Sequence, residues 1–270
     1  MKLAGAPISW GVCEVPGWGH QLEPERVLSE MRALGLTATE LGPDGFLTPA
    51  LIERHGMRDV GAFVPVVLHE PGHDPLPALR AAYPGRLVLA AATGRDGYDA
   101  RPVLDAEGWA TLLGNLDRVH AELGPRACLH PHVGTMVETR EEVARVLGGS
   151  SIPLCLDTGH LLIGGTDPAE LVRSDPGRIA HVHLKDVDAP LAQLVARGEL
   201  TYTQAVREGV YRPLGQGDVD VAGIVRGLDG SGYQGWYVME QDVVLSGPQD
   251  EPVENVRQSL AYLDGVLRVG

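Results

Sequence analysis

Four short apolar runs in this chain each end in residues of the kind that bind metals or transfer protons. The runs with their polar ends cover residues 127–132, 154–160, 179–186 and 236–242. Each apolar part is brief and rich in sheet-forming residues, which is typical of a parallel strand buried on both faces. Because parallel strands end at a common edge, we expect the four polar ends to meet at one mouth. In a barrel of eight parallel strands, that mouth is the active-site end.

The rest of the chain alternates predicted strands with predicted helices. Residues 189–211 are expected to form a helical insertion before the last strand. An amphipathic helix at 252–267 closes the series, and four more strands are expected at residues 3–9, 37–41, 60–68 and 87–92. Eight strands separated by helices predict an α/β fold, a (β/α)8 TIM barrel. The length of 270 residues is typical of one such barrel, so we expect a single domain over residues 1–270.

Composition and charge limit the partners that the chain can have. The formal net charge is -14, which disfavours nucleic acid and anionic membranes, because both require a basic surface. The sequence has no stretch of 18 apolar residues, so we expect no transmembrane helix. The first residues lack the apolar core of a signal peptide. The three cysteines form no disulfide framework, so we expect a cytoplasmic protein. A small-molecule substrate is compatible with this composition, as is a homo-oligomer.

The polar strand ends predict a divalent metal site. Asp157 ends one run and Glu240 ends another, where an unpaired carboxylate would be costly. His181 and His183 lie two residues apart on one strand, so their side chains face the same side. His183 is nearer the mouth and is the better ligand, whereas His181 is expected to be a deeper, hydrogen-bonded histidine.

Three residues are candidates for the metal ligand from the fifth predicted strand, which begins the run at residues 127–132. His130 and His132 share a two-residue spacing, so either can bind the metal while the other contacts substrate. Glu138, in the following loop, offers an oxygen ligand instead. A set of imidazoles and carboxylates suits Mn²⁺, Co²⁺, Fe²⁺ or Zn²⁺ and is too rich in nitrogen for a Ca²⁺ site.

Lysine usage singles out one candidate proton carrier. The chain contains only Lys2 and Lys185, and Lys185 lies at the polar end of the third run. General acid–base catalysis requires a side chain that holds or releases a proton beside the reacting atom. The candidate catalytic residues are His132, Lys185, His160 and Glu40.

Three further residues are candidate substrate contacts. Trp10, after the first predicted strand, is expected to form an apolar wall for a sugar face. Glu14, in the loop that follows, is expected to hydrogen-bond a substrate hydroxyl. His69 stands at the end of the third predicted strand and is expected to reach the same mouth.

Five motifs spread along the chain carry a family resemblance. They are Pro7-Ile8-Ser9-Trp10-Gly11-Val12, Thr39-Glu40-Leu41-Gly42-Pro43, His130-Pro131-His132-Val133-Gly134-Thr135, Leu156-Asp157-Thr158-Gly159-His160 and His181-Val182-His183-Leu184-Lys185-Asp186. Together they resemble the xylose isomerase-like TIM barrel superfamily of sugar phosphate isomerases and epimerases, and most of all its inosose dehydratase-type members. The resemblance covers essentially the whole chain.

The resemblance implies a metal site with one departure from the usual pattern. Superfamily members usually bind a divalent metal through Glu, Asp, His and Glu at strands five to eight. Asp157, His183 and Glu240 match the last three, whereas His130 stands at strand five, where Glu is usual. The change removes one of the two carboxylates that the epimerases use as paired acid and base, and it therefore favours an elimination or a base of another type.

The activity that the resemblance implies is metal-dependent dehydration of an inosose, such as 2-keto-myo-inositol. A base, His132 or Lys185, would take the proton next to the carbonyl, and an acid, His160 or Glu40, would assist departure of the β-hydroxyl. The alternatives are a ketose 3-epimerase or aldose–ketose isomerase, which returns the proton to the substrate, and a non-catalytic sugar-binding barrel. The acidic charge disfavours a barrel nuclease acting on abasic DNA.

Overall fold

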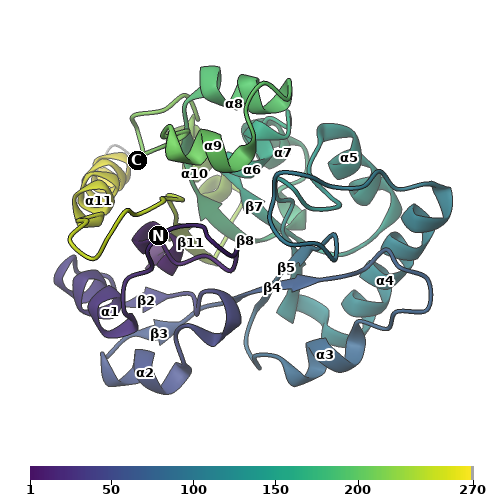
Figure 1. Ribbon diagram of the computed structural model, residues 1–270, viewed down its shortest axis with the longest axis horizontal. Helices are drawn as coiled ribbons and strands as arrows, with labels where there is room; N and C mark the ends of the chain where they lie inside the picture. The colour runs from purple at the N-terminus through teal and green to yellow at the C-terminus, as the bar shows by residue number, and fades with distance from the viewer. Residues whose placement is uncertain (269–270) are drawn as a thin grey trace.

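The computed structural model describes residues 1–268 and contains a nine-stranded parallel sheet that curls into the predicted barrel (Figure 1). The strands are β1 (Lys2–Gly5), β2 (Ala38–Thr39), β3 (Arg58–Asp59), β4 (Ala62–Val66), β5 (Leu87–Ala91), β6 (Ala127–Leu129), β7 (Leu154–Asp157), β8 (Ile179–Leu184) and β11 (Trp236–Met239). Their order in the sheet is β3-β2-β1-β11-β8-β7-β6-β5-β4. Strands far apart in sequence, such as β1 and β11, are therefore direct neighbours.

The sheet closes at a seam inside the third predicted strand. β3 and β4 stand at opposite ends of the sheet order, yet only Val60 and Gly61 separate them in the chain. The Val60 amide still donates to β2 at Thr39 O, and the Gly61 carbonyl accepts from Leu41 N. From Ala62 onward the strand pairs with β5 instead. Residues 58–66 thus act as one barrel strand that changes neighbours at Gly61.

Helices surround this barrel on the outside (Figure 1). They are α1 (Pro24–Ala33), α2 (Pro49–Arg54), α3 (Leu76–Ala81), α4 (Ala106–Leu123), α5 (Arg140–Gly149), α6 (Thr158–Ile163), α7 (Pro168–Ser174), α10 (Val221–Gly230) and α11 (Val253–Arg268). Several have strong start signals: at α5, Thr139 and Glu142 form a capping box that satisfies backbone amides at the helix start. None of the helices in residues 1–268 is long and apolar enough to span a membrane.

The insertion before the last strand is helical, as predicted. It contains α8 (Ala189–Ala196) and α9 (Tyr202–Arg207), between the short antiparallel strands β9 (Asp186–Val187) and β10 (Tyr211–Arg212). The buried Asp186 carboxylate fixes the returning loop, because it accepts hydrogen bonds from the amides of Gly215, Gly217 and Val219. Figure 1 shows α8 and α9 in green beside the barrel opening.

The first strand is shorter than expected, and this moves one predicted site residue. β1 ends at Gly5, and Pro7–Trp10 forms a 3-10 helix that ends at Gly11, whose φ is 79°. Pro7 has no amide hydrogen for the sheet and favours the first turn of a helix. The chain therefore turns away from the strand direction before it reaches Trp10.

Candidate functional site

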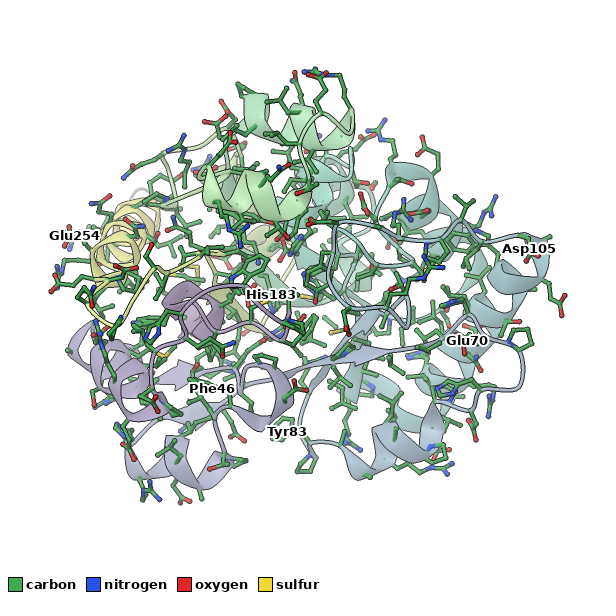
Figure 2. All side chains as sticks on the ribbon, viewed as in Figure 1. Phe46, Glu70, Tyr83, Asp105, His183 and Glu254 are labelled. Carbon is green, nitrogen blue, oxygen red and sulfur yellow. The ribbon has the colours of Figure 1, made fainter. Side chains whose placement is uncertain are left out.

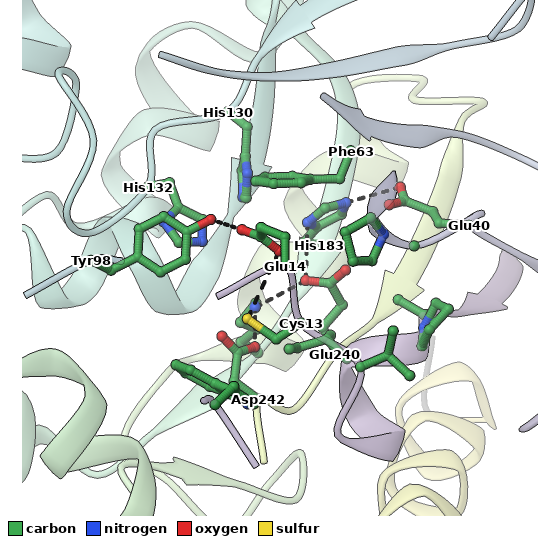
Figure 3. A pocket seen from close by; sticks show the side chains of 18 of the residues that line it. Cys13, Glu14, Glu40, Phe63, Tyr98, His130, His132, His183, Glu240 and Asp242 are labelled. Atoms are coloured by element: carbon green, nitrogen blue, oxygen red, sulfur yellow. Dashed lines mark hydrogen bonds and ion pairs between the residues drawn. The ribbon is translucent and has the colours of Figure 1, made fainter. Parts of the chain in front are cut away.

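A cavity lies at the C-terminal ends of the barrel strands (Figure 3). The space between its lining atoms, open solvent included, is about 540 Å³. Apolar and aromatic side chains form part of the wall, among them Phe63, Tyr98 and Tyr202. Polar side chains from five different segments converge in it: Glu14, Glu40, His130, His132, His183, Lys185, Glu240 and Asp242.

Three of the predicted metal ligands meet at one point beside this cavity. Asp157, His183 and Glu240 each offer one ligand atom, and these atoms lie within 4.8 Å of one another. His183 Nδ1 is 3.5 Å from Asp157 Oδ2 and 3.1 Å from Glu240 Oε2. Asp157 presents this oxygen because its other oxygen accepts from the amides of Gly159 and His160 at the start of α6.

The structure also distinguishes His130 from Glu138 as candidate ligands from the fifth barrel strand, which is β6. His130 follows β6, and its Nε2 lies 3.2 Å from Asp157 Oδ2. The Glu138 carboxylate turns away into its own loop, where it accepts from Gly134 N at 2.8 Å and pairs with Arg101 at 2.9 Å. His130 is therefore next to the cluster, and Glu138 is not.

Glu40 orients the imidazole of His183. His183 Nε2 donates to Glu40 Oε1 at 3.0 Å, which leaves Nδ1 buried without a hydrogen-bond partner and directed at the two carboxylates. Metal-bound histidines commonly donate their other ring N–H to a carboxylate in this way. An unpartnered imidazole nitrogen beside two buried carboxylates and a second imidazole is a donor set that fits a divalent cation.

His181 is the deeper histidine that the spacing predicts. Its Nε2 donates to the same Glu40 oxygen at 2.6 Å, and it does not line the cavity. Burial raises the pKa of Glu40, but the charges and hydrogen bonds of His183 and His181 outweigh it and hold that pKa well below its usual value. Glu40 is thus a fixed carboxylate between two imidazoles.

Lys185 is buried among carboxylates. Its Nζ lies 2.9 Å from Glu240 Oε2 and 3.8 Å from Asp157 Oδ2, and it also donates to Asp242. Burial alone would lower the pKa of the amine, but the charges of Asp242 and Glu240 hold it well above its usual range. The side chain is only 2% exposed and is an ammonium group in this environment.

His132 and His160 form a stacked pair, of which only His132 lines the cavity. Their ring centroids are 3.7 Å apart at an interplanar angle of 34°. His132 Nδ1 donates to the carbonyl of Val133 at 2.7 Å, so Nε2 is left as an acceptor. Burial, followed by the charge of His130, holds the pKa of His132 well below its usual value, which keeps the imidazole neutral.

Two of the three predicted substrate contacts lie outside the cavity. Trp10 is fully buried in the core, and its indole N–H donates to Glu30 of α1 at 2.7 Å. His69 lies on an outer depression beside Glu70, which Figure 2 shows near the rim of the molecule while His183 is close to its centre. β4 ends at Val66, so His69 already belongs to a loop that leaves the mouth. The expected roles of Trp10 and His69 are therefore corrected.

Glu14 does line the cavity. Tyr98 donates its hydroxyl to this carboxylate, and burial raises the pKa of Glu14. The aromatic ring of Tyr98 also packs on His132, with centroids 4.4 Å apart.

Several residues of the site were not predicted from the sequence. Asp242 has a recognisable signal, because it follows Glu240 by two residues at the polar end of the last run. Tyr98, Tyr202 and Phe63 have none, since each reaches the cavity from a loop, the insertion or a strand with no polar pattern around it.

Comparisons with known proteins identify the family of the chain. The family model described as "Xylose isomerase-like TIM barrel" matches residues 80–266. An inosose dehydratase of Geobacillus kaustophilus is 33% identical over 92% of this chain and 90% of that protein. The rhizopine catabolism protein MocC of Rhizobium meliloti is 33% identical over 90% of this chain and 82% of that protein. A crystal structure of the IolI protein with a bound zinc atom has a TM-score of 0.67 at 14% identity, covering 99% of this chain and 98% of that one. This chain belongs to the xylose isomerase-like TIM barrel family.

Proposed function

We propose that this protein is a metal-dependent hydro-lyase that dehydrates an inosose of the 2-keto-myo-inositol type. One observation carries the proposal: a neutral imidazole, His132, and an ammonium group, Lys185, line the same cavity as His183 and Glu240, two members of the cluster with Asp157. An elimination requires such a base and such an acid at one substrate. The similarity to an inosose dehydratase over most of the chain supports the choice of substrate.

The metal would be held by Asp157, His183, Glu240 and His130, with Glu40 orienting His183. A divalent ion, Mn²⁺, Co²⁺ or Zn²⁺, supplies a Lewis acid that polarises a carbonyl oxygen. The zinc in the IolI structure supports a divalent metal in this fold. His130 replaces the carboxylate that is usual on the fifth strand, so the cluster carries two carboxylates, those of Asp157 and Glu240.

His132 would act as the base. Its Nδ1 is committed to the carbonyl of Val133, so the free Nε2 is the atom that accepts the proton from the carbon next to the carbonyl. Tyr98 packs on the ring and holds its orientation. Lys185 cannot take this role because its nitrogen already carries its full set of protons.

Lys185 would act as the acid. As the C–O bond of the β-hydroxyl breaks, the ammonium gives a proton to the departing oxygen, and water forms. The remaining enol becomes a dione by tautomerisation, and the proton on His132 and the neutral Lys185 are reset by solvent. His160 is stacked behind His132 and Glu40 is bound to two imidazoles, so both fit supporting positions better than the acid role.

The test is product analysis with the metal-loaded protein. Incubation with 2-keto-myo-inositol should produce the ultraviolet absorbance of an enolised dione, and Asp157→Asn should abolish both the bound metal and the absorbance. Parallel incubations with keto-hexoses distinguish the alternatives. Epimerised or isomerised sugar without dione would instead identify an epimerase or isomerase. Absence of turnover with every substrate would identify a sugar-binding barrel. Either result overturns the proposal.

A further inference from the structure

The α8–α9 insertion reaches the catalytic groups through one side chain. Tyr202 is the first residue of α9, lines the cavity and is only 2% exposed. Its hydroxyl donates to Asp242 Oδ2 at 2.7 Å. The other oxygen of Asp242 accepts from Lys185. The carboxylate therefore lies between the insertion and the ammonium group, with one oxygen for each.

This link determines where the Lys185 ammonium lies. The lysine side chain is flexible, and its ammonium has two other carboxylates in reach, Glu240 at 2.9 Å and Asp157 at 3.8 Å. Both of these belong to the metal cluster. Among residues 1–268, Asp242 is the ion-pair partner of Lys185 that lies outside this cluster. Without the hydroxyl of Tyr202, its carboxylate loses one of its two side-chain hydrogen-bond partners. The ammonium would then move toward the metal ligands and away from the substrate.

The insertion is itself attached to two other loops at the mouth. The amide of Thr203 donates to Asp99 Oδ1 at 2.9 Å, and Arg207 donates to the carbonyl of Trp18 at 3.4 Å. The rings of Trp18 and Tyr202 are also neighbours, with centroids 6.4 Å apart. The position of Tyr202 is thus tied to the loops that follow β1 and β5.

We infer that Tyr202 is a positioning residue that acts through Asp242 on Lys185, so that the insertion has to be docked over the cavity before the β-hydroxyl can leave. The inference rests on the proposed function. Tyr202 exchanges no proton with the substrate in this scheme. It holds Asp242 in the rotamer that keeps the ammonium proton available for the departing oxygen. Removal of the α-proton by His132 does not require this contact.

The experiment separates the two halves of the reaction. In D2O, deuterium in recovered substrate measures removal of the α-proton, and dione absorbance measures elimination. Tyr202→Phe removes one hydroxyl and keeps the ring. Its ratio of exchange to elimination should rise by about tenfold or more, the size expected when a hydrogen bond to a charged group is lost. The kcat for dehydration should fall with KM little changed. The melting temperature of each variant confirms that it is folded.

Three comparisons make the result specific. Asp242→Asn breaks the same link from the other side and should shift the ratio in the same direction, and adding Tyr202→Phe to it should change the ratio no further. Asp99→Ala removes a tether of the same helix and should shift the ratio in the same direction. Tyr83→Phe removes a hydroxyl that donates to Asp59 outside the cavity, and it should leave the ratio as it is in the wild type.

Each remaining outcome overturns the inference in a recognisable way. Equal loss of exchange and elimination in Tyr202→Phe would mean a merely structural role, and additive effects in the double variant would mean that Tyr202 does not act through Asp242. A wild-type protein that yields no dione would overturn the proposed function, and the inference with it.

Discussion

Glu40 Oε1 lies 3.0 Å from His183 Nε2, and this contact fixes which nitrogen of His183 faces the cluster. Because Nε2 is directed at Glu40, Nδ1 is the ring nitrogen that faces Asp157 and Glu240. The same Glu40 oxygen also accepts a hydrogen bond from His181, the deeper histidine, which helps to hold the Glu40 carboxylate in place.

Weakening this contact should weaken metal binding without removing a ligand. In Glu40→Gln, the neutral amide is a poorer acceptor for two imidazole N–H groups. We expect metal affinity to fall by about 10–100-fold, the usual effect of changing a group that orients a ligand. Isothermal titration of the metal-free protein measures it. Unchanged affinity in the folded variant would contradict the orienting role.

A matched pair of variants can decide whether His130 or Glu138 binds the metal. His130→Ala should lower the bound metal per chain, because its Nε2 is beside Asp157 Oδ2. Glu138→Ala should leave it unchanged, because that carboxylate is directed to Gly134 and Arg101. Elemental analysis after dialysis against a low metal concentration gives both values. The reverse result would make Glu138 the ligand.

Replacing the base should stop both halves of the reaction. His132→Gln keeps a polar side chain but cannot take a proton, so α-proton exchange and dione formation should both fall by about 10²–10⁴-fold, the usual contribution of a general base. The bound metal should be retained. Deuterium incorporation is the decisive measurement, and exchange at the wild-type rate would mean that another group is the base.

Removing the metal should destabilise the protein. Asp157 and Glu240 are buried side by side with His183, and without a cation their negative charges are compensated only by Lys185 and neighbouring imidazoles. A hundredfold excess of free metal over its Kd should add about 2.7 kcal/mol to the free energy of unfolding. Thermal melts with chelator and after adding metal back measure the change. As a control, Asp157→Asn should melt at the same temperature in both conditions.

Much of the fold, and the convergence of the candidate metal ligands, follows from the sequence because apolar strands with polar ends have a simple geometry. Asp157, His183 and Glu240 converge because parallel strands end together, and the spacing of His181 and His183 correctly separates the deeper residue from the nearer one. The helical insertion was also recognisable, although its contribution of Tyr202 to the cavity was not.

The errors have local causes in the backbone. Trp10 was predicted at the mouth because the first strand was extended to residue 9, whereas Pro7 starts a 3-10 helix that carries the indole into the core. His69 was predicted at the end of a strand that stops at Val66. Side chains that arrive from loops, such as Tyr98, depend on how distant segments dock, and hydrophobic periodicity carries no information about that.

The seam of the barrel at Gly61 has a consequence for how such a protein can diverge. A Cβ at this position would lie 3.0 Å from Glu40 Oε1, so even a methyl group would press on the carboxylate that orients His183. The residue at which the third barrel strand changes neighbours therefore also lies against the carboxylate that contacts His183. A side chain at this join would therefore disturb both the closure of the barrel and the support of a candidate metal ligand.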